Sequence, residues 1–247
     1  MGDSVRIWIA GHRETTEPYW DNELYCPIQQ GSGQTFLNVR DNTGDNIAEW
    51  NPVYAEQTGQ YWIWKNADLT DYVGFTQYRR RFEFKDAEEV LDVFKQGYEA
   101  IACVPLNFQV VRQYAACHSI DDLKLAWEIV VDLFPWFMDA FKRYIMDGTR
   151  LYYSNGFVLK KQDFCDWCEF YQTFAKEFCK RRGWTDVAAA RAYIKSDIDA
   201  GKRIMSRGVD YQTEVIGFLS ERFFTAWLQG RFSKIYHKEY KKYEVLL

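Results

Sequence analysis

The residues best suited to chemistry begin with a short polar segment, residues 40–46, of sequence RDNTGDN. Its acidic and amide side chains surround Gly44 and are Asp41, Asn42, Asp45 and Asn46. Carboxylates, amides and backbone N–H groups in this arrangement can converge on a ligand rich in hydroxyl groups. The alternative is an Asx-rich turn that only ends one element and starts the next, and composition alone favours that alternative. The spacing does not fit a calcium loop, because no glutamate follows at the required position.

A second polar group follows a mostly apolar stretch, residues 71–78, which predicts a buried central strand. The polar residues at its end are Gln77, Tyr78, Arg79 and Arg80. They would lie at the carboxyl edge of the sheet, where α/β folds bind ligands. Guanidinium groups there could neutralise a departing diphosphate with bidentate geometry. The alternative is a basic strand end that pairs with surface acids.

A third group, Ser220, Glu221 and Arg222, interrupts the apolar stretch of residues 217–227. A buried carboxylate beside an arginine is costly unless it is paired, and such groups often have shifted pKa values at functional sites. Glu221 is therefore a candidate general base for an acceptor hydroxyl. The alternative is a structural ion pair between Glu221 and Arg222.

The histidines and cysteines indicate no metal site. His12 lies at the end of the first predicted strand and His118 precedes a helix, so each is either a residue at the ligand edge or an ordinary loop residue. His237 lies in a basic tail. Cys165 and Cys168 form a C-x-x-C inside an amphipathic helical stretch, without a second pair. The sequence also lacks a Walker loop, a G-x-S-x-G and a dinucleotide fingerprint.

Composition indicates a globular, cytoplasmic protein of one domain. With 247 residues the chain can bury a full core, and a net charge of −4 argues against a general partner such as nucleic acid. No apolar run approaches the length of a membrane span, and the N-terminus lacks the organisation of a signal peptide. The basic and aromatic tail, residues 230–247, is interpreted as a solvated final helix that packs on the domain. The alternative is peripheral contact with the inner face of a membrane.

Periodicity divides the chain into an α/β half, residues 1–109, and a mainly helical half, residues 110–247. Alternating strands and helices in the first half predict a layered α/β sheet. The predicted strands cover residues 5–12, 23–33, 71–78 and 99–106, with helices over 51–66 and 86–97. The second half predicts helices over 119–148 with a break at Pro135, 164–183, 185–202 and 211–231, and an aromatic strand within 150–164.

The ordered motifs resemble a family catalogued as domain of unknown function 4422. Its members are common in bacterial capsule and O-antigen clusters, and some are assigned as galactofuranosyltransferases. The segments that carry the resemblance are residues 40–66, 71–82, 152–170 and 217–228, with weaker likeness in 7–12 and 26–29. The resemblance therefore covers nearly the whole chain.

The resemblance implies a glycosyltransferase of the A type, with one Rossmann-like domain that binds a nucleotide sugar and has helical additions. The implied catalytic residues are Glu221, Asp45, Arg79 and Arg80. The implied donor-binding residues are His12, Asp41, Asn42, Gly44, Asn46, Glu56, Gln77 and Tyr78. The implied acceptor-binding residues are His118, Asn155, Ser220 and Arg222.

This sequence departs from the family pattern at three places. Gln77 replaces the usual His, Asn42 replaces an Asp, and Gly11-His12 stands where Thr-His is typical. The missing His and the absence of an Asp-x-Asp motif at the strand end favour a site without a metal, and leave Mn²⁺ or Mg²⁺ as the alternative.

The reaction that the resemblance implies is transfer from a UDP-sugar, with UDP-galactofuranose as a candidate, to a glycan or lipid-linked glycan, with inversion. Arg79 and Arg80 would stabilise the diphosphate, and Glu221 or Asp45 would deprotonate the acceptor hydroxyl. One rival interpretation is a carbohydrate-binding or assembly factor without turnover. Another is a nucleotide-sugar hydrolase or phosphotransferase at the same edge of the sheet.

Overall fold

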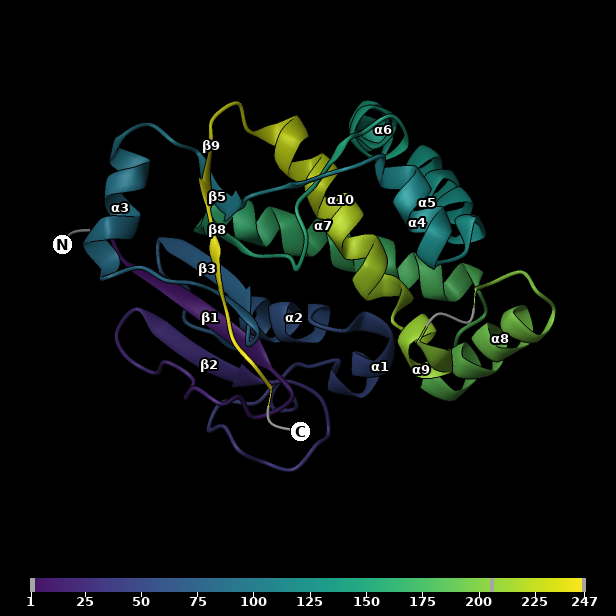
Figure 1. Cartoon of the computed structure of the whole chain (residues 1–247), viewed down its shortest axis with the longest axis horizontal. Helices are drawn as coiled ribbons and strands as arrows, with labels where there is room; N and C mark the ends of the chain where they lie inside the picture. Colours follow the sequence, from purple (N-terminus) through teal and green to yellow (C-terminus); the bar gives the residue numbers. More distant parts are fainter. Residues whose placement is uncertain (1–2, 205–206, 246–247) are drawn as a thin grey trace.

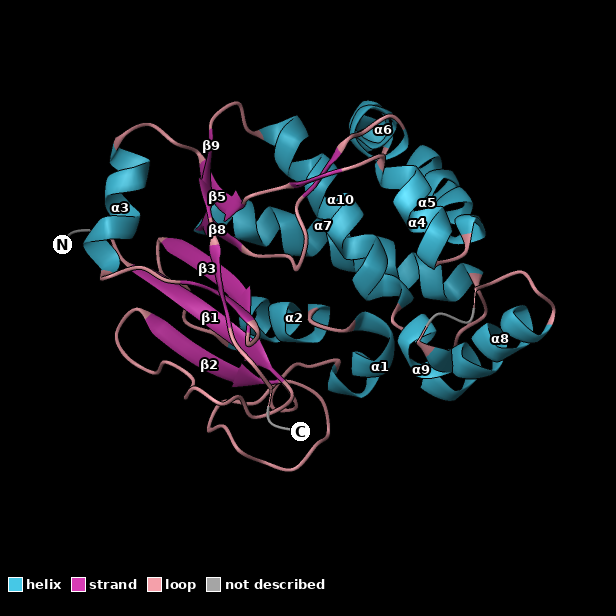
Figure 2. Ribbon diagram, viewed as in Figure 1, coloured by secondary structure: helices cyan, strands magenta, loops and turns pink. Residues whose placement is uncertain are grey.

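A mixed eight-stranded sheet forms the centre of the computed structural model, which describes residues 3–204 and 207–245 (Figures 1 and 2). Its strands are β1 (Val5–Gly11), β2 (Tyr25–Gln29), β3 (Tyr72–Gln77), β4 (Arg80–Phe82), β5 (Ala100–Cys103), β8 (Phe157–Lys160), β9 (Ile235–Lys238) and β10 (Tyr240–Lys242). A separate pair, β6 (Leu106–Asn107) and β7 (Arg150–Leu151), forms a small antiparallel ribbon.

The main part of the sheet has the order β2-β1-β3-β8-β5-β9. β8 is antiparallel to both of its neighbours, and the other five strands run parallel to one another. β4 turns back from the end of β3, and β10 adds to β4. The parallel strands are apolar on both faces, as expected where helices cover a sheet on both sides.

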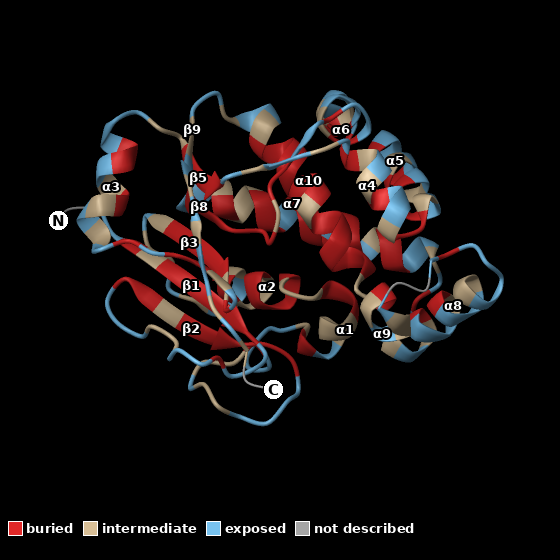
Figure 3. Ribbon diagram, viewed as in Figure 1, coloured by how far each residue is buried: buried red, intermediate tan, exposed pale blue. Residues whose placement is uncertain are grey.

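The described part of the chain has ten α-helices: α1 (Asn51–Tyr54), α2 (Gln57–Asn66), α3 (Ala87–Lys95), α4 (Val110–Cys117), α5 (Ile120–Leu133), α6 (Met138–Phe141), α7 (Lys161–Arg181), α8 (Val187–Asp199), α9 (Gly208–Thr213) and α10 (Val215–Arg231). Of these, α4, α5, α6, α8 and α9 gather on the side away from the sheet (Figure 1). The long helix α10 is largely buried, whereas α7 buries one face (Figure 3). None of the described helices is long and apolar enough to cross a membrane.

Side chains on β3 show how the layers are arranged. Phe75 stacks on Phe157 of β8, which in turn contacts Phe224 of α10, so α10 covers this face. Tyr72 contacts Phe94 of α3. Residues an odd number of positions apart on a strand point to opposite faces, so α3 covers the other side of the sheet.

The α/β prediction is confirmed, with two corrections. The helix predicted over residues 51–66 is two helices, because the chain breaks at Ala55, where φ is +48°. The basic tail is not a helix. It forms β9, parallel to β5, and β10, antiparallel to β4. Strands from both halves of the chain thus build one sheet, and the division at residue 109 stays a prediction about domains.

Candidate functional site

The carboxyl edge of the sheet gathers polar residues from distant segments. β1 and β3 are parallel neighbours, so the residues after them, His12 and Tyr78, come together there. The Tyr78 backbone N–H donates to the Ala10 carbonyl at 2.8 Å, and the Tyr78 hydroxyl lies 3.4 Å from Nε2 of His12. β8 is antiparallel to β3, so the loop before β8 reaches the same edge.

This loop is held in an unusual backbone conformation. Ser154 and Asn155 both have left-handed φ values, +63° and +46°, and both are buried. Such a conformation is uncommon for residues other than glycine and persists only where the surroundings enforce it. Here the Ser154 N–H donates to Oε1 of Glu221 at 2.7 Å. The carboxylate of α10 thus fixes the loop.

Asn155 connects two helices. Its Nδ2 donates to Oε1 of Glu56, the residue before α2, and to Oγ of Ser220 on α10 at 2.6 Å. Its Oδ1 is buried and has no hydrogen-bond partner within residues 3–204 and 207–245. Asn155 is therefore a positioning residue that holds Glu56 beside Ser220 and Glu221.

Glu56 reaches this position because the chain breaks before α2. Gly217 on α10 faces the break, and a Cβ at residue 217 would lie only 2.7 Å from Cβ of Ala55. Gly217, Ser220 and Glu221 are spaced i, i+3 and i+4, so they share one face of α10. The missing side chain at residue 217 lets the two elements approach closely enough for the polar contacts to form.

The carboxyl groups of this edge are partly removed from water. Burial, and next the negative charge of Glu221, raises the pKa of Glu56 to about 8. Burial raises the pKa of Glu214 to about 7, against the opposing positive charge of Arg79. Glu214 precedes α10, and its side chain accepts no hydrogen bond from any described residue. Glu214 is absent from the residues predicted from sequence, although an acid at the start of an apolar helix was a usable signal.

The three consecutive arginines have different environments. Arg79 is exposed, lies over the Tyr78 ring, and forms no ion pair with another described residue. Arg80 donates from Nη1 to Oγ of Ser154 at 3.3 Å. Arg81 is fully buried, donates to the carbonyl of Tyr78 at 3.0 Å, and lies 4.0 Å from the centroid of the Tyr243 ring. Only the first two can meet a ligand.

The residues predicted to bind an acceptor are buried instead. Ser220 and Asn155 are 0% exposed, Arg222 2% and His118 4%. Arg222 donates to Oε2 of Glu221 at 2.9 Å and to Gln113, so the structural ion pair considered as an alternative does form. Burial, and next the charge of Arg222, lowers the pKa of His118 to about 3. These side chains position the site rather than touch a ligand.

Most of the polar segment 41–46 forms a turn beside α2. Asp41 is buried and accepts from the Gly31 N–H at 3.0 Å and the Thr58 hydroxyl at 2.7 Å. Asn46 caps its own turn through Gly44 and Ala48.

Asp45 and its neighbours lie at the far end of α2. The Asp45 carboxylate accepts from Tyr61 at 2.9 Å, and its backbone N–H donates to Asn66 at 2.9 Å. Asn66 lies roughly 13 Å along α2 from its first residue, Gln57. The structure therefore does not bring Asp45 to Glu56 and Glu221, and the exposed Asn42 and Gly44 lie in the same turn. The segment is built as an Asx-rich turn that begins beside the carboxyl end of β2, and its part in donor binding stays a prediction.

No group of three or more His, Cys, Asp or Glu in residues 3–204 and 207–245 is arranged to hold a metal ion. Glu56, Glu214 and Glu221 share one edge, but Glu221 is occupied by Ser154 and Arg222.

Comparisons with known proteins agree with this fold. A family model described as domain of unknown function (DUF4422) matches residues 6–193. A solved apo structure of a bifunctional glycosyltransferase, WbbM, aligns with a TM-score of 0.70 and 23% sequence identity, which shows a shared fold. The alignment covers 97% of this chain and 45% of the WbbM chain, so this chain spans less than half the length of WbbM. No curated protein matches. The prediction of a glycosyltransferase A-type fold is confirmed.

Proposed function

The chain belongs to the family described as domain of unknown function (DUF4422), and from that premise we propose that it is a glycosyltransferase. It would transfer a sugar from a nucleotide-sugar donor to a hydroxyl of a glycan or lipid-linked glycan during cytoplasmic synthesis of a surface polysaccharide. The proposal rests on one observation: arginine side chains that can meet a ligand and partly buried carboxyl groups lie together at one edge of the sheet. Transfer needs both, one group for the leaving diphosphate and one for the attacking hydroxyl.

Arg79 is the group for the diphosphate. Its guanidinium is exposed and has no carboxylate partner among the described residues, so its charge is available to a ligand. It follows β3 directly, at the edge where α/β folds hold phosphates. Arg80, held by Ser154, adds a second positive charge. Charge stabilisation of a departing diphosphate is usually the largest catalytic contribution in such sites, and here it would need no metal ion.

We assign proton transfer to Glu214, in place of Asp45 and Glu221. Both Glu221 oxygens accept protein hydrogen bonds, from Ser154 and Arg222, which suits a positioning residue. Glu214 has free oxygens and a pKa raised to about 7, close to the value at which a general base works best near neutral pH. Arg79 lies near enough to Glu214 for its charge to act on the carboxyl group, so base and arginine share one site, and inversion is the outcome we propose for the transfer.

The donor is expected to carry UDP, and galactofuranose is the sugar that the family resemblance suggests. His12 and Gln77 lie beside Arg79 and would contact the donor, and the buried Tyr78 would hold His12 in place. Glu56 would meet the sugar of the donor. The structurally similar WbbM is described as a bifunctional glycosyltransferase and is more than twice as long. This chain would supply one transferase activity.

The proposal is tested by thermal unfolding of the chain with UDP, GDP, CMP or dTDP, each with manganese and with chelator. A nucleotide at about a hundred times its Kd adds roughly 2.7 kcal/mol, or about 5–10 °C in Tm. UDP should stabilise the wild type in chelator and should not stabilise Arg79→Ala. If no nucleotide raises the Tm, the donor site is refuted, and the rival of a carbohydrate-binding factor without turnover takes its place.

A further inference from the structure

A groove with a volume of about 530 Å³ lies between α2 and α7, away from the carboxyl edge. Its part of α2, Tyr61 to Lys65, lies roughly 6–12 Å along the helix from Gln57. We propose that this α2–α7 groove binds an acidic segment of the glycan acceptor, a sugar chain that carries carboxylate or phosphate groups. Volumes of 300–1,000 Å³ are typical of ligand sites, so the groove can hold a few sugar units.

Aromatic rings form the walls of the groove. Trp50 and Trp64 each lie edge-on to a neighbouring tyrosine, at 5.9 Å from Tyr54 and 6.0 Å from Tyr61. Both tryptophans are half-buried, so their rings line the groove and do not project from the surface. Large amphipathic rings offer an apolar face to the C–H groups of a sugar and a polar edge to its hydroxyls.

Trp184 also lines the groove. The residue is only 4% exposed, and its indole Nε1 is buried without a hydrogen-bond partner in the described part of the chain. A buried polar group without a partner costs free energy. This N–H is closed to solvent, so Trp184 adds its ring to the lining of the groove and no accessible donor.

The charged side chains that line the groove favour an anionic ligand. Three lysines line it, Lys65, Lys176 and Lys180, and no lining residue is acidic. Nζ of Lys65 lies over one face of the Trp64 ring, 3.4 Å from its centroid, so a sugar could stack only on the other face of this ring. Lys176 forms no ion pair among the described residues, while Lys180 is 3.0 Å from Glu177.

Two carboxylates near the groove are already engaged. Asp45 is bonded to Tyr61, and Glu177 is shared between Lys180 and Arg181. The groove thus remains positive in a chain whose net charge is −4. That net charge disfavours nucleic acid and an anionic membrane as general partners, and recessed rings suit a slender chain better than a lipid surface.

This inference rests on the proposed function, because it names the class of acceptor, but its test needs no turnover. Calorimetric titration of the full chain would use a galacturonate octasaccharide and a phosphorylated mannan oligosaccharide, with a dextran octasaccharide as the neutral reference. Binding of at least one acidic sugar, tenfold or more tighter than dextran, is the expected result. Which acidic sugar binds distinguishes carboxylate from phosphate as the anion.

Variants then locate the binding. Lys176→Ala/Lys180→Ala and, separately, Trp64→Ala should each weaken binding at least tenfold. The matched control, Lys95→Ala/Lys124→Ala, also removes two exposed lysines, each paired with an acid three residues earlier, and should leave the affinity unchanged.

The proposal is overturned if all variants bind the acidic sugar with equal affinity, or if dextran binds as tightly as the acidic sugars. It is also overturned if the lysines contribute only to binding of phosphatidylglycerol vesicles or of a single-stranded oligonucleotide. Arg79→Ala separates the two sites. If Arg79→Ala no longer shows a UDP-induced rise in Tm but still binds the acidic sugar, both proposals stand. If the wild type binds the sugar but no nucleotide, only the transferase proposal fails.

Discussion

Glu214 is the residue whose protonation should govern the reaction. Because burial raises its pKa to about 7, the carboxylate fraction grows as pH rises through 7. A general base acts only when deprotonated, so kcat/KM should rise with pH across this range. Glu214→Gln should remove this rise of kcat/KM with pH and lower kcat/KM by roughly 10²–10⁴-fold. Initial rates of sugar transfer from pH 5 to 9 would measure both effects.

Glu221→Gln is the control for that assignment. It keeps an oxygen to accept from the Ser154 N–H but removes the charge opposite Arg222. Glu221→Gln should lower the rate of transfer, but kcat/KM should still rise with pH as in the wild type. If this rise disappears in Glu221→Gln and persists in Glu214→Gln, Glu221 is the base and the assignment is reversed.

At the level of single residues, sequence alone identified the polar groups but not their roles. Glu56, Gln77 to Arg80, Asn155, Ser220 and Glu221 do share one edge of the sheet. Whether a polar side chain faces solvent or the interior depends on partners far away in sequence. Arg222 is buried by Gln113 and Tyr114, about a hundred residues earlier, and nothing in its local sequence indicates this.

At the level of elements, Gly217 controls how closely α10 approaches the break before α2. Gly217→Val would place Cβ 2.7 Å from Cβ of Ala55, and overpacking of this kind typically costs about 1–3 kcal/mol. The helices should separate, the Asn155 contacts to Glu56 and Ser220 should weaken, and transfer should fall at least tenfold. Urea unfolding and transfer rates would be measured together.

Gly230→Ala is the control within the same helix. Its Cβ would meet Ala140 at a milder 3.2 Å, and residue 230 is exposed. Activity should remain close to that of the wild type. Wild-type rates in Gly217→Val would show that the close approach is not needed for the site.

The predicted elements were most reliable where patterning is local. The strands at β1 and β3 and the break at Pro135 follow from apolar runs and from proline itself. The break at Ala55 packs against Gly217, about 160 residues later, and the strands of the tail pair with β4 and β5, more than 130 residues earlier. Propensity alone cannot supply these long-range partners.

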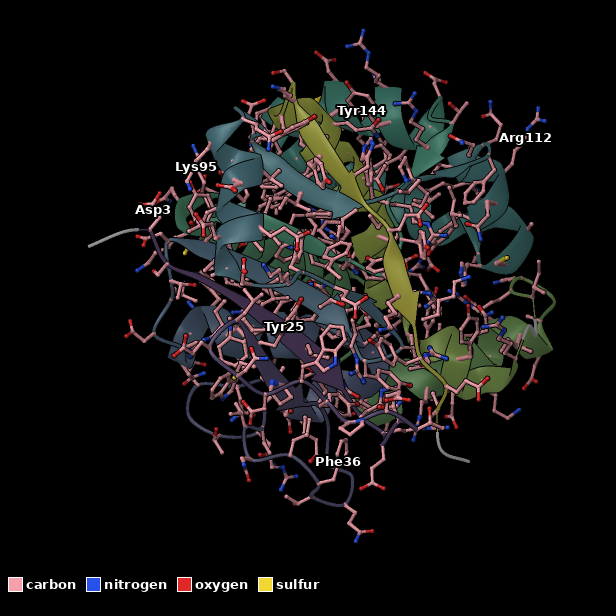
Figure 4. The ribbon with its side chains drawn as sticks, turned by 60° about the vertical axis from the view of Figure 1, so that its left-hand side comes forward. Asp3, Tyr25, Phe36, Lys95, Arg112 and Tyr144 are labelled. Atoms are coloured by element: carbon pink, nitrogen blue, oxygen red, sulfur yellow. The ribbon has the colours of Figure 1, made fainter. Side chains whose placement is uncertain are left out.

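At the level of the whole molecule, the end of the chain supports the site built by its first half. β10 pairs with β4, which carries Arg80, and Tyr243 donates its N–H to the Arg79 carbonyl at 3.0 Å. On the other side of β4, the Tyr25 hydroxyl donates to Phe82 at 2.9 Å and accepts from Phe84 at 2.8 Å (Figure 4, where Tyr25 is labelled). The arginine hairpin is thus held from both sides.

Tyr240 links this hairpin to the loop of Asn155. Its ring stacks on Phe82 with centroids 4.8 Å apart, and its hydroxyl donates to the Tyr153 carbonyl at 3.2 Å. A side chain at Gly156 would collide with that hydroxyl, so the loop and the tail fit each other closely. The last strand therefore sets the distance between the arginines and the Ser154–Asn155 loop.

Replacing Tyr240 should consequently affect donor binding as well as stability. Tyr240→Ala should cost up to about 3 kcal/mol in urea unfolding, because its ring is half-buried, and should abolish the UDP-induced rise in Tm. Tyr240→Phe loses one hydrogen bond, about 1 kcal/mol, and should keep that rise. Tyr236→Ala on β9 is the matched control, because Tyr236 packs on Tyr98, away from the hairpin. It should lower stability and retain the UDP response, so loss of the response in both alanine variants would mean that the tail acts only through global stability.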